Sequence, residues 1–314
     1  MRPIQNSQKK RPTNTDPVQT LRDHQPRHAF FVGIDSDGCA FDTMAVKQRQ
    51  CFCQQMIACF GLQPIAEAAC ECMDFAALQS RTRGANRHKT TKRVIAELLP
   101  GHPMVRRCGF RVPDFPHYFR WVDDPSSILS NGGLQRAIDR ATDPAARKEL
   151  ELALRWSRQA DAMIADGIRR IPPFPLVRES LEKIATVADV AVLSSASTES
   201  LDQEWAEHGI DRYVSVIAGQ EMGPKVRQLA CATEGKYNGH HVLMIGDSPG
   251  DLEAAKANGT LFYPIIPGRE AVSWRTLHNE IFDTFVAGRY AGAREAEHIA
   301  EFDRWFSVSP PWQT

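Results

Sequence analysis

The sequence predicts an α/β fold, a doubly wound parallel sheet with a mainly helical domain inserted into it. Three observations lead to this prediction. Short apolar runs alternate with helical stretches over residues 171–268, the pattern of parallel strands joined by crossover helices. An isolated apolar run at 29–34 supplies a further strand. The segment between these regions, 43–170, has helical rather than strand periodicity.

The first strand ends in Asp35-Ser-Asp-Gly, the composition of a polar loop. Helices are expected in the inserted domain over 43–60, 65–81 and 89–99, and a long helix is expected from Pro144 to about Asp166. Several prolines and a Gly-Gly pair predict irregular structure over 100–133. The second half alternates between helices at 177–187, 199–208, 225–233 and 249–258 and strands at 189–193, 213–218, 241–245 and 260–263.

These elements divide the chain into four parts. The sheet and its helices form an α/β core, and the helical insertion forms a cap domain directly after the first strand. The expected boundaries are a disordered tail at 1–28, the core at 29–42 and 171–268, the cap at 43–170, and a C-terminal helical extension at 269–314.

Composition excludes several classes of protein. The 314 residues include 38 Lys and Arg against 38 Asp and Glu, and this zero net charge argues against a nucleic-acid binder. Apolar runs of about 18 residues, which a membrane-spanning helix needs, do not occur. Residues 1–28 are basic and polar without an apolar stretch, so a disordered tail is expected rather than a secretory signal. An organelle-targeting segment is the lesser alternative.

The eight cysteines are expected to be free thiols in a reducing cytoplasm, since no secretory signal is recognised. Cys51 and Cys53, like Cys70 and Cys72, are separated by one residue. On a helix such a pair points to faces about 200° apart, which disfavours zinc binding. Buried small side chains are the expected role.

Polar residues stand at the carboxyl ends of four predicted strands. Each alone would be interpreted as a solvated turn or a helix cap. Because the ends of parallel strands meet at one edge of the sheet, these side chains are expected to converge. They are Asp35 and Asp37 after the first strand, Ser195 after the second, Lys225 after the third, and Asp247 and Asp251 after the fourth.

This set of residues indicates phosphoryl transfer. Carboxylates that converge repel one another unless a cation joins them, and oxygen ligands favour Mg²⁺. A carboxylate beside Mg²⁺ can attack phosphorus and form an aspartyl phosphate. Serine and lysine suit the other phosphoryl oxygens, and a second aspartate can protonate the leaving oxygen.

Four segments resemble the motifs of the haloacid dehalogenase superfamily of phosphotransferases. The resemblance is closest to the branch of phosphoglycolate phosphatases and β-phosphoglucomutases, whose helical cap follows the first strand. The segments are Asp35-Ser-Asp-Gly-Cys-Ala-Phe-Asp-Thr43, Ser195 within Val192-Leu-Ser-Ser-Ala-Ser197, Lys225, and Gly246-Asp-Ser-Pro-Gly-Asp251.

The resemblance implies a role for each position. It makes Asp35 the nucleophile, and Asp37 the general acid and base whose backbone carbonyl also binds Mg²⁺. The remaining roles are phosphoryl binding by Ser195 and Lys225, metal binding by Asp35 and Asp247, and support of the metal water and of Lys225 by Asp251. An acid at position 37 favours phosphate esters over the dehalogenase reaction. Two departures are Cys39 in place of the usual Thr, and Gly246 where the mutases tend to have Glu, which favours a hydrolase.

A basic stretch of the cap, residues 81–89, is expected to form a loop between helices. In capped phosphatases of this type such a loop faces the strand ends. Arg83, Asn86 and Arg87 would then bind an anionic or hydroxyl-bearing leaving group. A solvated basic turn is the competing interpretation.

The expected function is a cytoplasmic, Mg²⁺-dependent phosphatase. Its partner would be a small-molecule phosphate ester, hydrolysed through an aspartyl-phosphate intermediate, with no nucleic acid or membrane involved. A sugar-phosphate mutase is the second enzyme hypothesis, and a non-catalytic phosphate-binding pseudoenzyme is the third. The sequence specifies neither the physiological substrate nor the oligomeric state.

Overall fold

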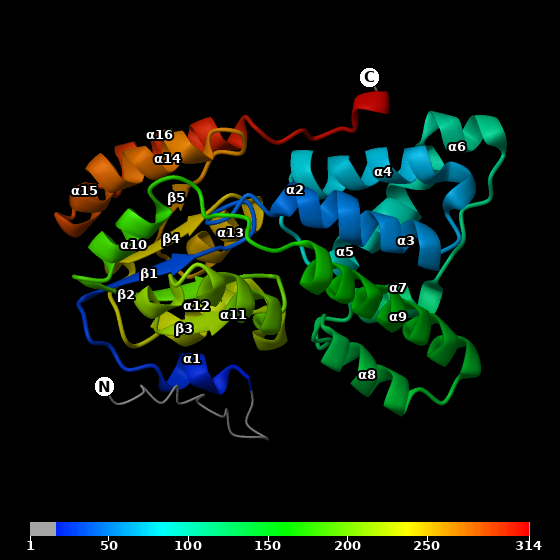
Figure 1. Cartoon of the computed structure of the whole chain (residues 1–314), viewed down its shortest axis with the longest axis horizontal. Coiled ribbons are helices and arrows are strands. Elements are labelled where there is room, and N and C mark those ends of the chain that lie inside the picture. Colours follow the sequence, from blue (N-terminus) through cyan, green and yellow to red (C-terminus); the bar gives the residue numbers. More distant parts are fainter. Residues whose placement is uncertain (1–16, 314) are drawn as a thin grey trace, which may run out of the picture.

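The computed structural model describes residues 17–313 and has a parallel sheet at its centre. The five strands lie in the order β3-β2-β1-β4-β5, so the first strand of the sequence is the middle of the sheet (Figure 1). This order, with crossovers on both sides of β1, confirms the predicted doubly wound α/β core. The strands are β1 (Phe30–Ile34), β2 (Ala188–Leu193), β3 (Val216–Ala218), β4 (Val242–Gly246) and β5 (Leu261–Pro264).

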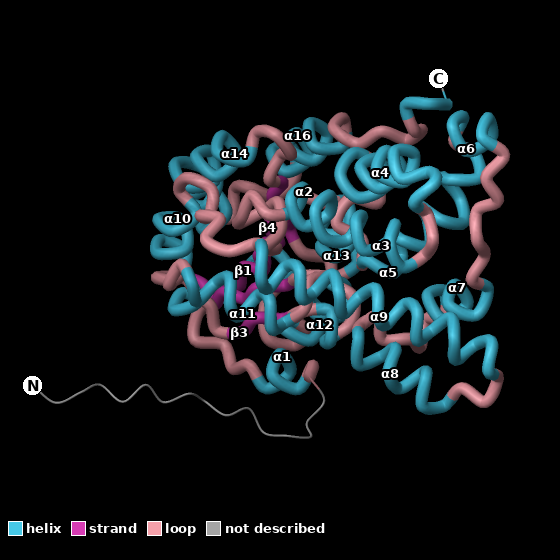
Figure 2. The backbone as a smooth tube through the Cα atoms, turned by 45° about the vertical axis from the view of Figure 1, so that its right-hand side comes forward, coloured by secondary structure: helices cyan, strands magenta, loops and turns pink. Residues whose placement is uncertain are grey.

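The side chains of each strand alternate between two hydrophobic layers. In β1, Val32 and Ile34 pack into one layer, whereas Phe31 packs into the other. Figure 2 shows the strands surrounded by helices. The first layer is covered by α10 (Val177–Ile184), α11 (Thr198–Glu207), α14 (Glu270–Thr276) and α15 (Phe282–Val286). The second is covered by α1 (Gln19–Asp23), α12 (Lys225–Thr233), α13 (Pro249–Ala257) and α16 (Ala293–Asp303).

The expectation of a disordered tail over 1–28 is wrong for residues 17–28, and residues 1–16 lie outside the described part of the chain. Val18 and Leu21 are buried, and their helix α1 packs against α12. The buried carboxylate of Asp189 accepts hydrogen bonds from the backbone N–H groups of Arg27 and His28, at 2.8 and 3.0 Å. Two buried apolar residues one helical turn apart and these hydrogen bonds attach the segment to the core, although its composition is mostly polar.

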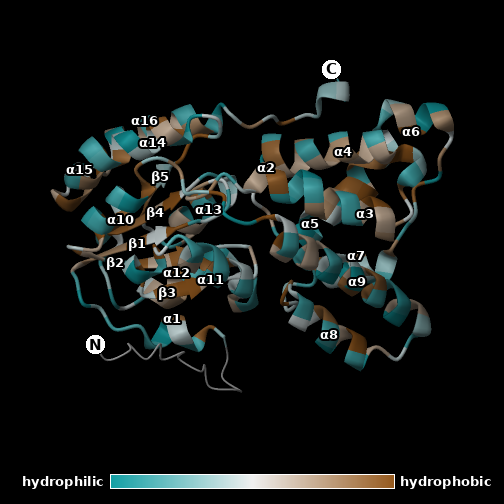
Figure 3. Cartoon of the chain, viewed as in Figure 1, coloured by the Kyte–Doolittle hydropathy of each residue, from teal (hydrophilic) through white to brown (hydrophobic). Residues whose placement is uncertain are grey.

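Residues between β1 and α10 form the helical cap, which has its own hydrophobic core (Figure 1). Hydrophobic residues concentrate on the strands of the core domain and on α3 of the cap (Figure 3). The helical segments are α2 (Met44–Val46), η1 (Lys47–Phe52), α3 (Cys53–Cys59), η2 (Gln63–Ile65), α4 (Ala66–Asp74), η3 (Phe75–Gln79), α5 (Arg87–Lys92), η4 (Arg93–Leu98), η5 (Leu99–Gly101), α6 (Pro103–Cys108), α7 (Pro116–Asp123), α8 (Asn131–Arg140) and α9 (Pro144–Gly167).

The predicted irregular structure over 100–133 is wrong, because α6, α7 and the start of α8 lie there. Pro103 and Pro116 occupy the first positions of α6 and α7, where a missing N–H costs nothing. Gly133 sits within α8 because a Cβ there would lie 1.7 Å from the backbone oxygen of Ile128. The prolines that were interpreted as helix breakers therefore start helices. The glycine that was interpreted in the same way allows a close backbone contact.

The segment after β5 packs on the core and then crosses to the cap (Figure 1). It comprises α14, η9 (Leu277–Ile281), α15, α16 and η10 (Pro311–Gln313). The backbone N–H of Ser307 donates to the carbonyl of Gln79 in the cap at 2.8 Å. The Trp312 ring lies 4.7 Å from His102 and 5.8 Å from Phe75, measured between ring centroids. The C-terminal extension thus joins the two domains.

The cysteines are free thiols, as expected. Cys51, Cys53 and Cys72 belong to the cap core, and the Cys53 thiol lies 3.4 Å from that of Cys70. Within residues 17–313, no cysteine belongs to a group that could hold a metal ion. No helix in that range is long and apolar enough to cross a membrane.

Candidate active site

Three carboxylates from three elements meet at the carboxyl edge of the sheet. Asp35 follows β1, Asp247 follows β4, and Asp251 lies in the first turn of α13. One oxygen of each carboxylate lies within 4.8 Å of the others, and all three side chains are buried. The parallel sheet therefore brings together the residues that the sequence placed at strand ends.

Lys225, the first residue of α12, joins two of these carboxylates. Its Nζ atom lies 2.6 Å from Asp35 Oδ2 and 2.6 Å from Asp251 Oδ1. Asp251 Oδ2 in turn accepts from the backbone N–H and the hydroxyl of Ser248, at 3.0 and 2.7 Å. Although burial opposes the charged form, the two carboxylates hold the pKa of Lys225 above its usual value. The ammonium is therefore a fixed positive charge beside Asp35.

The carboxylates remain electrostatically unsatisfied despite this lysine. Burial, reinforced by repulsion from the neighbouring aspartates, raises the pKa of Asp35 to about 8 and that of Asp247 to about 6. Asp247 Oδ1 is buried and has no hydrogen-bond partner among the described residues. An unpaired buried oxygen in a group of three carboxylates fits a small hard divalent cation such as Mg²⁺.

Asp37 is held by a second lysine, which sequence reasoning missed. Asp37 Oδ1 accepts from the hydroxyl of Thr43 and lies 2.5 Å from Lys47 Nζ. Lys47 Nζ also lies 3.1 Å from Glu204 Oε1 on α11. Burial, together with repulsion from Asp37, raises the pKa of Glu204 to about 7, although Lys47 opposes the shift. A lysine placed between apolar helix residues, Met44-Ala-Val46 and Cys51-Phe52, was the available signal.

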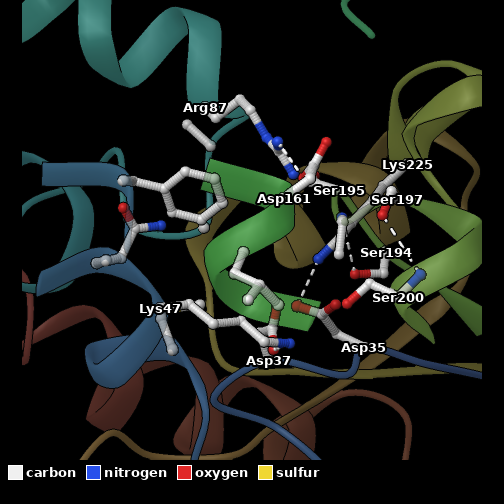
Figure 4. A pocket seen from close by; sticks show the side chains of 17 residues that line it. Asp35, Asp37, Lys47, Arg87, Asp161, Ser194, Ser195, Ser197, Ser200 and Lys225 are labelled. Atoms are coloured by element: carbon white, nitrogen blue, oxygen red, sulfur yellow. Dashed lines mark hydrogen bonds and ion pairs between the residues drawn. The ribbon is translucent and has the colours of Figure 1, made fainter. Parts of the chain in front are cut away.

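A cavity of about 50 Å³ opens over these groups, between the strand ends and the cap. Asp35, Asp37, Ser195 and Lys225 all line it, as Figure 4 shows. The turn that carries Ser195 is shaped by Ser194, whose hydroxyl accepts from the backbone N–H of Ala196 at 3.2 Å. The structure thus brings the expected nucleophile, general acid and phosphoryl-binding residues to one small cavity.

Arg83 occupies a different place from that expected. Its guanidinium lies 2.6 Å from Asp247 Oδ2 through Nη2, and Nε donates to the same oxygen at 2.8 Å. Gly38 makes this approach possible, because its φ is +81° and a Cβ there would lie 2.7 Å from Arg83 Nη2. Arg83 lines neither of the two cavities at this site. It links the cap to the carboxylate cluster instead of facing a leaving group.

The side chains of Asn86 and Arg87 also lie in different environments. The Asn86 side chain caps α5 by accepting from the backbone N–H of His88 at 3.0 Å, and it donates to the carbonyl of Leu129 at 2.9 Å. Arg87 lines the small cavity, where Nη1 lies 2.5 Å from Asp161 Oδ1 and the guanidinium covers the Phe52 ring at 4.5 Å (Figure 4). Arg83 and Arg87 are each 7% exposed, so the alternative of a solvated basic turn is wrong for both.

A second cavity of about 530 Å³ adjoins the first. The two share Lys47, Asp161, Ile164, Ser197 and Ser200, and the larger one extends between α9 of the cap and α11 of the core. Its volume lies in the range of small-molecule sites, whereas the small cavity is about a tenth of that size.

Comparison with known proteins finds one family model that matches part of this chain. The family model of haloacid dehalogenase-like hydrolases matches residues 131–264, which include β2 to β5, Ser195, Lys225 and Asp247. No curated protein matches the chain.

Several solved structures align with most of this chain at low sequence identity. A predicted phosphoglycolate phosphatase from Haemophilus somnus 129pt is 15% identical, with a TM-score of 0.46 over 76% of this chain and 86% of that one. A predicted phosphatase from Clostridium acetobutylicum is 14% identical, with a TM-score of 0.43 over 82% and 99%. Both TM-scores are below 0.5, and nothing about activity follows from these similarities.

The match over residues 131–264 confirms the resemblance that the motifs predict. The parallel sheet and the carboxylate cluster at its edge agree with it. Residues 131–264 of this chain are therefore similar to haloacid dehalogenase-like hydrolases.

Proposed function

We propose that the protein is a Mg²⁺-dependent phosphatase that hydrolyses a small phosphate monoester through an aspartyl phosphate on Asp35. The observation that carries this proposal is the position of the Asp35 carboxylate. It is buried at the end of the central strand, in contact with Lys225, and it faces the cavity that Asp37 and Ser195 also line.

In the first step, a carboxylate oxygen of Asp35 attacks phosphorus, and the bond from phosphorus to the leaving oxygen breaks. Asp37 gives its proton to that oxygen, so the product leaves as an alcohol. Lys225 and the Ser195 hydroxyl face the same cavity and would bind the phosphoryl oxygens during the transfer. The leaving group would occupy the larger cavity between α9 and α11.

In the second step, Asp37 takes a proton from water. The water oxygen attacks phosphorus, the bond to Asp35 breaks, and inorganic phosphate forms. Asp35, Asp247 and the backbone carbonyl of Asp37 would hold Mg²⁺. When bound, the ion would neutralise the repelling carboxylates and the charge on the phosphoryl oxygens.

Phosphate release from a panel of phosphorylated metabolites, with Mg²⁺ and with EDTA, tests this proposal. Hydrolysis is expected with Mg²⁺ and not with EDTA. Ca²⁺ is expected to inhibit, because its looser and larger coordination shell allows Asp35 to bind through both oxygens and lose its line of attack. Equal rates in Mg²⁺ and EDTA would contradict the metal assignment. Conversion of a hexose 1-phosphate without phosphate release would favour the mutase hypothesis.

A further inference from the structure

Lys47 is a deeply buried cation whose side-chain ion pairs within residues 17–313 are both with carboxylates. It is the first residue of η1, one helical turn after Thr43, and its side chain is 5% exposed. Its Nζ atom lies 2.5 Å from Asp37 Oδ1 and 3.1 Å from Glu204 Oε1. Lys47 lines both cavities and Glu204 lines the larger one, but neither takes part in the two proposed chemical steps.

Glu204 is fixed at both of its oxygens. Oε1 pairs with Lys47, and Oε2 accepts from the hydroxyl of Ser36 at 3.2 Å. Ser36 stands between Asp35 and Asp37 in the sequence, and its hydroxyl accepts from the Trp205 indole N–H at 3.0 Å. The network therefore connects α11 both to the loop that carries the two aspartates and to the first turn of the cap.

The side-chain hydrogen bonds that Asp37 accepts from the described residues all involve one of its two carboxylate oxygens. Thr43 and Lys47 both bind Oδ1, whereas Oδ2 accepts no hydrogen bond from residues 17–313. Asp37 lines the same cavity as Asp35 and Lys225, so the uncommitted Oδ2 is the oxygen available to a ligand there. Holding one carboxylate oxygen fixes the rotation of the side chain and hence the place of the other.

We infer that Lys47, oriented by Glu204, is a positioning residue that fixes the Asp37 carboxylate for proton transfer to the leaving group. This inference rests on the proposed function. It assigns to Lys47 no contact with the reacting phosphoryl group. The physical basis is that a buried lysine is costly unless it is paired, and an apolar residue of similar length would serve a purely structural position better. Apolar neighbours for such a residue are present, since Met44, Phe52 and Ile164 line the same cavity.

The inference has a kinetic signature. Protonation of the leaving oxygen matters most when the leaving alkoxide is a strong base, and it matters little when the leaving group is a stable nitrophenolate. A loss of Asp37 positioning should therefore slow the first chemical step for an alkyl phosphate more than for nitrophenyl phosphate. General damage to the fold or to phosphoryl binding would slow both substrates alike.

The experiment compares Lys47→Met, Glu204→Gln and the reference variant Asp37→Asn, using propyl phosphate and nitrophenyl phosphate as probes. Single-turnover measurements report the first step alone. For Lys47→Met, we expect a loss of about 10²-fold with propyl phosphate and only a few-fold with nitrophenyl phosphate, within the range for a misplaced general acid. Glu204→Gln should show the same pattern with a smaller loss. For both variants kcat should fall while KM changes little.

Lys92→Met is the matched control. Lys92 also lies in the cap and pairs with a carboxylate, at 2.5 Å from Asp123 Oδ1, but it lines neither cavity. Its replacement should leave the rates with both probes unchanged. If Lys47→Met does not fold, Glu204→Gln carries the test, because it changes one atom of the network and leaves the lysine in place.

The inference would be overturned if Glu204→Gln and a folded Lys47→Met each hydrolysed the two probes with equal slowing. It would also be overturned if both variants kept full activity with both probes. The reference variant separates this failure from failure of the proposed function. If Asp37→Asn itself shows no dependence on the leaving group, then Asp37 is not the general acid, and the proposed function fails. If Asp37→Asn shows that dependence and the other two variants do not, only the positioning role of Lys47 and Glu204 fails.

Discussion

The carboxyl edge of the sheet and the basic loop of the cap were both expected to form the site, and they behave differently. At the edge, Asp35, Lys225 and Asp251 form one contact chain, as parallel strands require. In the loop, residues close in sequence diverge to three environments, which are the Asp247 carboxylate, the start of α5 and the wall of the small cavity. Topology constrains where strand ends meet, whereas a loop between helices places each side chain by its own local contacts.

The largest loss of stability and activity is expected when Lys225, at the edge of the sheet, is replaced. Lys225→Met leaves the buried carboxylates of Asp35 and Asp251 without their shared cation, which should lower the free energy of unfolding by about 3–5 kcal/mol. Turnover should fall in parallel for every substrate, because the phosphoryl group is common to all. Urea denaturation and a substrate panel measure the two effects. A loss confined to some substrates would mean that Lys225 does not act on the phosphoryl group.

The second prediction concerns pH in metal-free protein. The pKa values of Asp35 and Asp247 are raised to about 8 and about 6, so the folded state keeps protons that the unfolded chain has lost. The contribution of Asp35 and Asp247 to the free energy of unfolding should therefore decrease as pH rises from about 4 to 8. The total decrease should be on the order of a few kcal/mol. Added Mg²⁺ should oppose the fall, since it binds the ionised carboxylates of the folded protein.

Asp35→Asn isolates this effect from other titrating groups, such as the buried His88, whose pKa is lowered by burial. Denaturation is measured in EDTA at several pH values for both proteins. The decline with rising pH should be shallower in the variant. An identical pH dependence in the two proteins would show that the Asp35 carboxyl is not protonated in the folded state.

A smaller effect should distinguish the two cap arginines. Arg83→Gln removes a positive charge from Asp247, so half-maximal activity should require less Mg²⁺, with all substrates affected alike. Arg87→Gln should weaken only substrates whose leaving group reaches the cap, by about tenfold, and should spare a small aryl phosphate. Mg²⁺ titrations and a substrate panel measure these outcomes. If the two variants changed the Mg²⁺ requirement and the substrate preference in the same way, the different roles assigned to Arg83 and Arg87 would be wrong.

The smallest effect is expected at Asn86. Asn86→Ala removes the side chain that caps α5 and should lower the free energy of unfolding by about 1 kcal/mol. Turnover should stay at the wild-type rate, because Asn86 lines neither cavity. Thermal denaturation and steady-state kinetics provide the two measurements. A loss of activity without a loss of stability would show that Asn86 contributes to substrate binding and not only to capping α5.

The same contrast explains how much the sequence could predict. The strands and the residues after them were predictable because apolar runs mark buried parallel strands and topology gathers their ends. Lys47 and Glu204 were not, since they meet only when η1 of the cap packs near α11 of the core. The helices over 103–140 were missed because proline starts a helix as readily as it breaks one, and local composition does not distinguish the two cases.

The central claim is that Asp35 becomes phosphorylated, and trapping that intermediate tests it most directly. Asp37→Asn should still react with radiolabelled nitrophenyl phosphate, whose leaving group needs no acid, but it should be slow to activate water. After acid quenching in the first turnover, the label should therefore accumulate on the peptide that contains Asp35, and it should be absent when Asp35→Asn is added to the same protein. Product formed without any labelled peptide, or a label that persists without Asp35, would contradict the account.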